Sequence, residues 1–263
     1  MAAGLSQRRS CTLAGISRSC WAYQKRPKDD EQIITLLRAY ALAEKRAGYW
    51  RAYGHLRRQG LPINHKRVQR LWQLAGLQVP KPKRRRRRRA ASQAVPLRAE
   101  RPRHVFTYDF LEDSTRDGQT LRILTIVDEF TRECPAITAS RSFTSADVIR
   151  VLAQVFAEYG RPAFIRSDNG PEFIAYALCA WLYQQGIDTY HIDPGSPWQN
   201  PYGESFNARL RDECLNLEEF LTVLEAQVVL ENWRRQYNTQ RPHSSLGDIP
   251  PAEFHRRWHG PPH

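Results

Sequence analysis

The chain lacks the features that mark secreted, zinc-binding and membrane proteins. Its five cysteines, at positions 11, 20, 134, 179 and 214, are odd in number and form no Cys-x-x-Cys pair. Neither a disulfide framework nor a zinc site is therefore expected. No apolar run approaches the roughly 20 residues that a membrane-spanning helix needs, and the first residues lack the apolar core of a signal peptide. These absences predict a cytoplasmic protein with no membrane partner.

Lysine is absent from residues 104–263, although the 263-residue chain has a net charge of +13. Residues 1–103 hold 26 of the 40 Lys and Arg but only 5 of the 27 Asp and Glu, a net charge of +21. The rest of the chain carries 14 basic and 22 acidic residues, a net charge of −8. A basic front and an acidic rear indicate polyanion binding in the first part and metal-assisted chemistry in the second.

The basic part contains two patterns typical of small helical DNA-binding units. In residues 1–27, a turn at Gly15 between two short helices predicts a helix-turn-helix, and a basic tail is the alternative. In residues 28–80, apolar residues at helical spacing and a cap at Asn64 predict three helices. A basic face on the third helix suits DNA, although a solvated surface is the alternative. The residues of that face are Lys66, Arg67 and Arg70.

Residues 81–103 are predicted to be a basic linker between two domains. A run of consecutive arginines cannot pack together, because each repels its neighbours without a counter-charge. On DNA the same charges become favourable, since each neutralised phosphate releases condensed counterions. The linker should supply affinity with little sequence preference. Its expected DNA-binding residues are Lys81, Lys83, Arg84, Arg85, Arg86, Arg87, Arg88 and Arg89.

Residues 104–247 have the element order of a ribonuclease H-like α/β fold. Three antiparallel strands are expected near 104–112, 121–128 and 133–140, followed by a helix from Thr144 to Gly160, a strand at 163–167, a helix at 172–185, a strand at 188–192 and a helix that Asn200 caps. Such a fold has a five-stranded mixed sheet with flanking helices, and its first and fourth strands are adjacent. A further helix should begin near Thr222, and residues 248–263 should form a C-terminal tail.

Three acidic residues are placed where they could meet. Asp109 interrupts an apolar strand, Asp168 ends a second strand, and Glu204 lies one turn into a helix. Taken singly, Asp168 suits an ordinary turn and Glu204 suits the favourable interaction of an acid with a helix N-terminus. Asp109 is harder to explain in this way, because a buried unpaired carboxylate is costly.

Together, these acids predict a site for two divalent cations. Crowded carboxylates repel one another and need cations to remain ionised. Oxygen ligands without nearby His or Cys favour Mg²⁺, with Mn²⁺ as a substitute. Two such ions can activate an attacking water or 3′-hydroxyl and stabilise the leaving oxygen of a phosphoryl transfer.

The chain resembles the transposases encoded by the second reading frame of bacterial two-frame insertion elements, relatives of retroviral integrases. The resemblance rests on the acids Asp109, Asp168 and Glu204, with 35 residues between the last two, and on three phrases. These phrases are VDEFTREC (Val127 to Cys134), GSPWQNPYGESFNARLRDE (Gly195 to Glu213) and YNTQRPHSSLG (Tyr237 to Gly247). One departure is Phe106, where many relatives have tryptophan.

This resemblance implies cleavage of DNA at insertion-element ends and attack of the freed 3′-hydroxyl on target DNA, with the three acids as catalytic metal ligands. It also implies double-stranded DNA as the partner, at the terminal inverted repeats and at the target. Pairing two ends suggests a homo-oligomer, and the product of an upstream reading frame is a further candidate partner. Two rivals remain, a DNA-binding protein that does not cut and a ribonuclease H-like nuclease that hydrolyses without joining.

Several residues near the acids are candidates for DNA contacts. The set is Asn169, Trp198, Gln199, Tyr202, Asn207 and Arg211. Trp198 suits base stacking or structural packing, and Asn207 and Arg211 share the helix face of Glu204. Other polar residues are assigned structural roles: Asp128 and Glu129 in a turn, Glu172 at a helix start, and His191 packed at a strand end.

Overall fold

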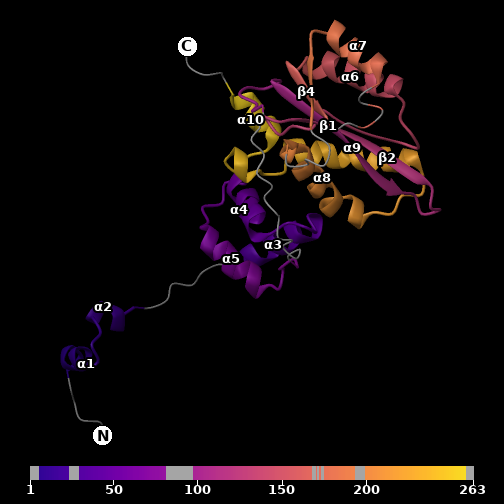
Figure 1. Cartoon of the computed structure of the whole chain (residues 1–263). Coiled ribbons are helices and arrows are strands. Elements are labelled where there is room, and N and C mark those ends of the chain that lie inside the picture. Colours follow the sequence, from indigo (N-terminus) through magenta and orange to yellow (C-terminus); the bar gives the residue numbers. More distant parts are fainter. Residues whose placement is uncertain are drawn as a thin grey trace.

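A five-stranded mixed sheet forms the centre of the second part of the chain (Figure 1). The computed structural model describes residues 6–23, 30–80, 97–167, 170, 172, 175–192 and 199–258. Within them the strands are β1 (Val105–Ser114), β2 (Thr120–Asp128), β3 (Ala136–Ser140), β4 (Phe164–Ser167) and β5 (Asp188–His191). Their order across the sheet is β3-β2-β1-β4-β5.

The first and fourth strands lie side by side, as the element order predicts. β1 pairs antiparallel with β2 and parallel with β4, where Thr107 is the register partner of Arg166. β3 begins three residues later than expected. The reason is local, because the carbonyl of Glu133 accepts the N–H of Asp128 at 2.9 Å and closes the turn before β3.

Alternate residues of β1 and β2 enter two separate cores, one on each face of the sheet. Helices α6 (Ser145–Tyr159) and α7 (Tyr176–Gln184) cover the face that carries Phe106 and Tyr108. Helices α8 (Pro201–Glu213) and α9 (Val223–Thr239) cover the face that carries Leu111 and Ile123. Asp109 has the same parity as Leu111, so its side chain belongs to the face of α8.

Helix limits follow the local sequence in most places. Thr144 and Asp147 form the expected capping box of α6, and Gly160 ends that helix with a φ of +88° that few other residues adopt. α7 begins at Tyr176, so the prediction that Glu172 starts the helix is wrong. Glu172 instead pairs with Arg122 of β2, and this ion pair lowers the pKa of its carboxyl group.

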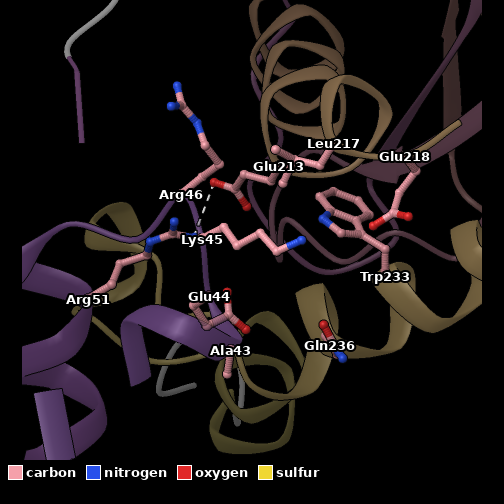
Figure 2. Close-up of a pocket in the computed structure, with 10 residues that line it drawn as sticks. All are labelled: Ala43, Glu44, Lys45, Arg46, Arg51, Glu213, Leu217, Glu218, Trp233 and Gln236. Carbon is pink, nitrogen blue, oxygen red and sulfur yellow. Dashed lines mark hydrogen bonds and ion pairs between the residues drawn. The ribbon is translucent and has the colours of Figure 1, made fainter. Parts of the chain in front are cut away.

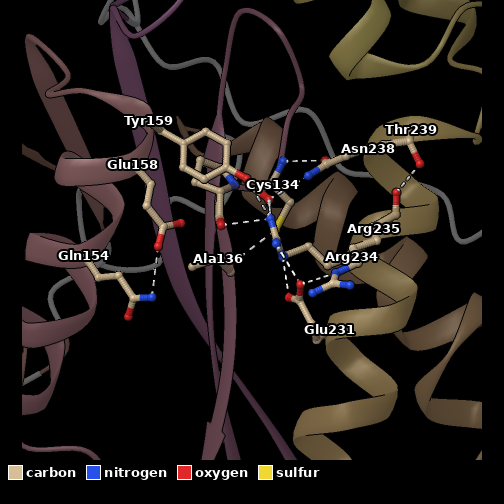
Figure 3. A network of polar contacts seen from close by, with 11 residues as sticks. Cys134, Ala136, Gln154, Glu158, Tyr159, Glu231, Arg234, Arg235, Asn238 and Thr239 are labelled. Atoms are coloured by element: carbon tan, nitrogen blue, oxygen red, sulfur yellow. Dashed lines mark hydrogen bonds and ion pairs between the residues drawn. The ribbon is translucent and has the colours of Figure 1, made fainter.

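Helix α9 is held against the start of β3 by a buried network (Figure 3). Asn238 accepts the N–H of Cys134 and donates to its carbonyl, both at 2.9 Å. Arg234 donates to the carbonyls of Cys134 and Pro135 and to the hydroxyl of Tyr159, each at 3.0 Å. The network satisfies backbone groups that would otherwise be buried without partners.

The first part of the chain is helical. Three helices, α3 (Asp30–Ala43), α4 (Tyr49–Arg58) and α5 (His65–Leu74), share a small core. The predicted cap of α5 is confirmed, since Asn64 accepts the N–H of Lys66 at 2.8 Å. Two short helices precede them, α1 (Gln7–Leu13) and α2 (Arg18–Trp21), with Gly15 in the turn between them. Among the described residues, no helix is both long enough and apolar enough to cross a bilayer.

The last described residues form a helix that is not predicted from the sequence. After the short 3-10 helices η2 (Leu215–Leu217) and η3 (Ser244–Leu246), the chain continues into α10 (Pro251–Arg257). The rings of Phe254 and Trp258 each lie 5.7 Å from the ring of Phe130, and His255 bonds Glu133. The expected tail is therefore packed on the turn that follows β2.

A buried ion pair fixes the end of β4. Arg166 and Glu129 are 1% and 0% exposed in their side chains, and Nη1 of Arg166 lies 2.9 Å and 3.0 Å from the two carboxylate oxygens. Arg166 also donates to the carbonyl of Leu97, where the described chain resumes before β1. Burial raises the pKa of Glu129, and the charges of Arg166 and Arg132 oppose that rise. The sequence predicted only a turn role for Glu129 and did not predict its ion pair with Arg166.

Replacing Arg166 with methionine should destabilise the fold by about 3 to 5 kcal/mol at pH 8, because it leaves a buried carboxylate without its partner. The loss should shrink at lower pH. In the unfolded chain Glu129 loses its proton as the pH rises through its usual pKa of 4.5. In the folded state burial raises that pKa, so the carboxyl group keeps its proton to higher pH. Stability of the variant therefore falls as pH rises, by up to about 1.4 kcal/mol per pH unit.

Chemical unfolding followed by tryptophan fluorescence at pH 5 and pH 8 measures both effects. Arg150→Met is the matched control, since the Arg150 side chain is 77% exposed and pairs with Asp147 on the surface. The control should lose less than about 1 kcal/mol. Equal losses in the two variants at pH 8 would contradict the role given to Arg166.

Candidate active site

Asp109 is a half-buried carboxylate on β1, and both of its oxygens accept hydrogen bonds. The backbone N–H of Phe110 donates to Oδ1 at 2.8 Å, and Nδ2 of Asn207 donates to Oδ2 at 2.7 Å. The second bond crosses from α8 to the sheet. It orients the carboxylate toward the helix that carries Glu204.

The start of α8 is seated on β1. Asn200 caps the helix by accepting the N–H of Gly203 at 3.2 Å, and the same oxygen accepts the hydroxyl of Thr107 at 2.7 Å. Pro201 takes the first helical position, as the sequence predicts. A Cβ on Gly203 would lie 2.7 Å from the side-chain nitrogen of Asn200, so only glycine leaves room for this cap. The acid Glu204 follows immediately.

Asn207 joins the helix acid to the strand acid. It lies three residues after Glu204, and residues at this spacing are neighbours on a helix surface. Its side-chain oxygen accepts the hydroxyl of Thr125 at 3.1 Å, and Thr125 is the register partner of Asp109 on β2. The side of α8 that carries Glu204 therefore contacts the part of the sheet that carries Asp109.

The third predicted acid, Asp168, lies outside the described residues, and so do Asn169 and Trp198. The residue before Asp168, Ser167, is described and buried. Its hydroxyl lies 3.1 Å from Nδ1 of His191. This bond gives His191 a structural partner. Within the described residues, no three His, Cys, Asp or Glu side chains are grouped to hold a metal ion.

The remaining candidates for DNA contacts are spread over two sides of α8. Gln199 is buried beside the cap, and Arg211 donates to the carbonyl of Glu112 at 3.3 Å. Tyr202 lies on the other side of the helix by its spacing from Glu204. There the guanidinium of Arg132 is 3.8 Å from its ring centre. None of these contacts tests a role in DNA binding.

The basic face of α5 is already paired in part. Asp30 at the start of α3 binds Arg67 at 2.8 Å and Arg70 at 2.7 Å, and these bonds lower the pKa of Asp30. Lys66 is exposed. The predicted linker residues Lys81, Lys83, Arg84, Arg85, Arg86, Arg87, Arg88 and Arg89 lie outside the described residues.

The C-terminal end of α8 contacts the helical part of the chain. Asp212 binds Arg46 at 2.6 Å, and Glu213 lies between Arg51 at 3.1 Å and Arg241 at 2.7 Å. Figure 2 shows the ion pair of Arg51 and Glu213 beside the pocket that the two parts line. Burial raises the pKa of Glu213, but Arg241 and Arg51 outweigh it and hold that pKa below its usual value.

Two of the residues that position the site were not predicted in that role. Arg166 lies within the partly apolar strand β4. A basic residue in such a strand is rarely buried without an acidic partner, so its position in the sequence could have predicted a partner such as Glu129. Asn200 was recognised only as a cap, although it also bonds the sheet. Asp128 takes the turn role predicted for it, because its carboxylate accepts the backbone N–H of Arg103 at 2.8 Å and of Phe130 at 2.8 Å.

The described fold agrees with comparisons to known proteins. Two family models described as "Integrase core domain" match residues 99–197 and 185–251, and one described as "HTH-like domain" matches residues 28–87. A chain of the simian T-cell lymphotropic virus intasome in complex with PP2A regulatory subunit B56 gamma has a similar fold, with a TM-score of 0.55 and 17% identity over 76% of this chain and 70% of that one.

Sequence relatives come from bacterial insertion elements. The 39.2 kDa protein of insertion element IS476 from Xanthomonas euvesicatoria is 40% identical over 95% of this chain and 72% of its own length. The 31.7 kDa protein of IS407 from Burkholderia multivorans is 39% identical over 95% of this chain and 90% of its own length. The transposase of IS904 from Lactococcus lactis is 28% identical over 76% and 84%. With its integrase core and HTH-like region, the chain belongs to the insertion-element transposase family.

Proposed function

We propose that this transposase cleaves DNA strands at the ends of its insertion element and joins the freed 3′-hydroxyl to target DNA in a metal-dependent reaction. The observation that carries the proposal is the 2.7 Å bond from Asn207 to Asp109. It brings the strand acid beside the helix face of Glu204. An integrase core with these two acids together suits phosphoryl transfer.

Asp168 completes the proposed set on the basis of register. Thr107 pairs with Arg166 in the parallel β1 and β4 ladder. Asp109 follows Thr107 by two residues, and Asp168 follows Arg166 by two. On this equal sequence offset we propose that Asp168, which lies outside the described residues, completes the set with Asp109.

The donor set fits a hard cation. Asp109, Asp168 and Glu204 offer only oxygen, and His191 at the end of β5 is bonded to Ser167. These three acids would hold Mg²⁺, as two ions, and Mn²⁺ would serve as a substitute. The bound ions would activate the attacking hydroxyl and stabilise the leaving oxygen.

The chain's own residues prepare this site before any DNA arrives. Asn207 holds the Asp109 carboxylate in one orientation, and Asn200 fixes the first turn of α8, so neither acid has to be ordered during the reaction. Catalytic groups that already point at the reacting position add to rate, because no reorganisation is needed then.

DNA binding is assigned to the basic first part and to residues that border the acids. Double-stranded DNA would lie along the linker 81–103, and Arg67 and Arg70 would exchange Asp30 for phosphate. Asn169, Trp198, Tyr202 and Arg211 would contact the strand being cut. Gln199 and Asn207 are buried and would instead position the site. We divide the chain accordingly into 1–27, 28–80, 81–103, 104–247 and 248–263. Two element ends require a homo-oligomer on DNA, and the product of an upstream reading frame is a further proposed partner.

Asp109→Asn, Asp168→Asn and Glu204→Gln should each lower the rate of strand joining by at least about 10³-fold, a loss of about 4 kcal/mol of transition-state stabilisation. Each removes a charged ligand but keeps the side-chain shape, so DNA binding should persist. Gel analysis of a plasmid that carries the element's own ends measures cleavage and joining separately.

Glu112→Gln is the control, since Glu112 lies on β1 with an exposed side chain. Its joining rate should match that of the unchanged protein. Full joining by Asp168→Asn would contradict the proposed site. Cleavage without joining in the unchanged protein would favour a nuclease, and binding without either reaction would favour a protein that only binds DNA.

Changing Arg84 to Arg89 together to glutamine should weaken DNA binding and its dependence on salt. The slope of log affinity against log salt should become shallower by about 0.9 for each phosphate that the variant no longer neutralises. Fluorescence anisotropy with labelled duplexes between low and physiological salt measures the slope. A control that changes Arg150 and Arg235, which are exposed and paired with acids, should keep it; an unchanged slope in the linker variant would refute the role of the arginines.

A further inference from the structure

A cavity of about 190 Å³ lies on the side of α8 away from Glu204. Its walls come from three segments far apart in the sequence. They are the end of β2 with the turn after it, α8 from Tyr202 to Arg209, and the chain from Tyr237 of α9 to η3. They belong to the same three phrases that carry the family resemblance. The polar residues that line the cavity are Arg132, Tyr202, Ser205, Arg209, His243 and Ser245.

Two guanidinium groups line this cavity without an acidic partner. Arg132 donates to the carbonyl of Glu129 and stacks on Tyr202, and Arg209 donates to the carbonyl and hydroxyl of Ser205. Throughout the part of the chain that the structure describes, neither group is in an ion pair with a carboxylate. Burial, with the charge of Arg241, lowers the pKa of Arg209. Half-buried cations that form no direct ion pair are costly.

His243 adds a buried donor to the same cavity. His243 is 5% exposed, and its Nε2 atom is buried with no hydrogen-bond partner among the described residues. Its backbone is fixed by a bond from its N–H to the carbonyl of Ile249 at 3.1 Å. Burial and the nearby arginines lower the pKa of His243 to about 2, so the ring is neutral and one ring nitrogen carries a hydrogen. A buried polar atom of this kind calls for a partner.

These observations point to an anion. Two guanidiniums present several N–H groups in a planar fork that matches the oxygens of a phosphate. With its hydrogen on Nε2, the His243 ring is a further neutral donor, as are the hydroxyls of Ser205 and Ser245. No carboxylate lines the cavity to repel an anion, and the volume exceeds that of a few water molecules, at about 30 Å³ each.

We propose that this cavity binds a phosphate group through Arg132, Arg209 and His243. The phosphate is either free inorganic phosphate or a phosphodiester of the DNA backbone. The site is separate from the three acids, and its test does not require transposition. On the opposite side of the helix that carries Glu204, a bound phosphate would tie the turn after β2 to the chain around η3.

The test titrates inorganic phosphate into the full-length protein at constant ionic strength, with chloride as the balancing anion. Isothermal calorimetry reports binding, and nitrogen NMR reports the His243 ring, assigned by its loss in His243→Gln. We expect saturable binding and a shift of the His243 signal. Arg209→Met and Arg132→Asn should each weaken binding at least about tenfold, since each removes charge-assisted hydrogen bonds to the phosphate.

The variants are chosen to keep the fold. Asn tolerates the left-handed backbone of Arg132, whose φ is +64°. Arg209→Lys keeps the charge but lacks the planar fork, so its affinity should fall between those of the unchanged protein and Arg209→Met. Arg150→Met, which changes an exposed arginine on α6, should bind as the unchanged protein does. Circular dichroism confirms folding of each variant before binding is compared.

A second arm adds a short DNA duplex. If the duplex moves the His243 signal and displaces phosphate, the site takes a backbone phosphodiester; if only inorganic phosphate moves it, the site takes the free anion. Both outcomes support a phosphate site. The proposal is overturned if neither ligand moves the His243 signal, or if Arg209→Met and Arg132→Asn bind phosphate as tightly as Arg150→Met does.

Discussion

The hydrogen bond from Asn207 to Asp109 is the contact on which the arrangement of the site depends. It connects a helix to a strand 98 residues away in the sequence, and it has a length of 2.7 Å. A half-buried carboxylate on a sheet surface is costly unless polar groups satisfy it. Asn207 meets that requirement, and its own oxygen is satisfied by Thr125. Sliding α8 along the sheet would break both bonds, so this one position of the helix is favoured over others.

Helix α8 links several parts of the molecule because each of its surfaces has a different neighbour. Phe206 and Leu210 enter the core beneath the sheet. The side of Glu204 contacts the strand acid, and the opposite side lines the cavity of Arg209 and His243. The last residues, Asp212 and Glu213, pair with arginines of the helical part and of the chain after α9. Movement of the helical part would therefore be transmitted to α8, the helix that carries Glu204.

Local sequence signals predicted much of this fold. Caps such as Asn64 and Thr144 mark helix starts because the side chain and the backbone group that it binds are only two or three residues apart. The adjacency of β1 and β4 followed from element order, because few topologies fit that order. The start of α7 was misplaced because Glu172 has an ion-pair partner 50 residues away, which no local pattern reveals.

Contacts between distant side chains were the harder part to predict. The Arg166 and Glu129 pair joins residues 37 apart, and the bond of Asn200 to Thr107 spans 93. The cavity needs three segments to fold together before its walls exist. Helix α10 was missed for another reason: prolines at 250 and 251 suggested irregular chain, yet proline is well suited to the first turn of a helix. Local patterns did predict the elements that carry two of the acids, since Asp109 lies on β1 and Glu204 in the first turn of α8.

The most direct measurement is X-ray diffraction from crystals of the protein grown with Mn²⁺, with data collected at the manganese absorption edge. If the account is right, anomalous density will appear among the carboxylates of Asp109, Asp168 and Glu204, and Asn207 will still bond Asp109. Manganese bound elsewhere, with these three carboxylates pointing apart, would contradict it.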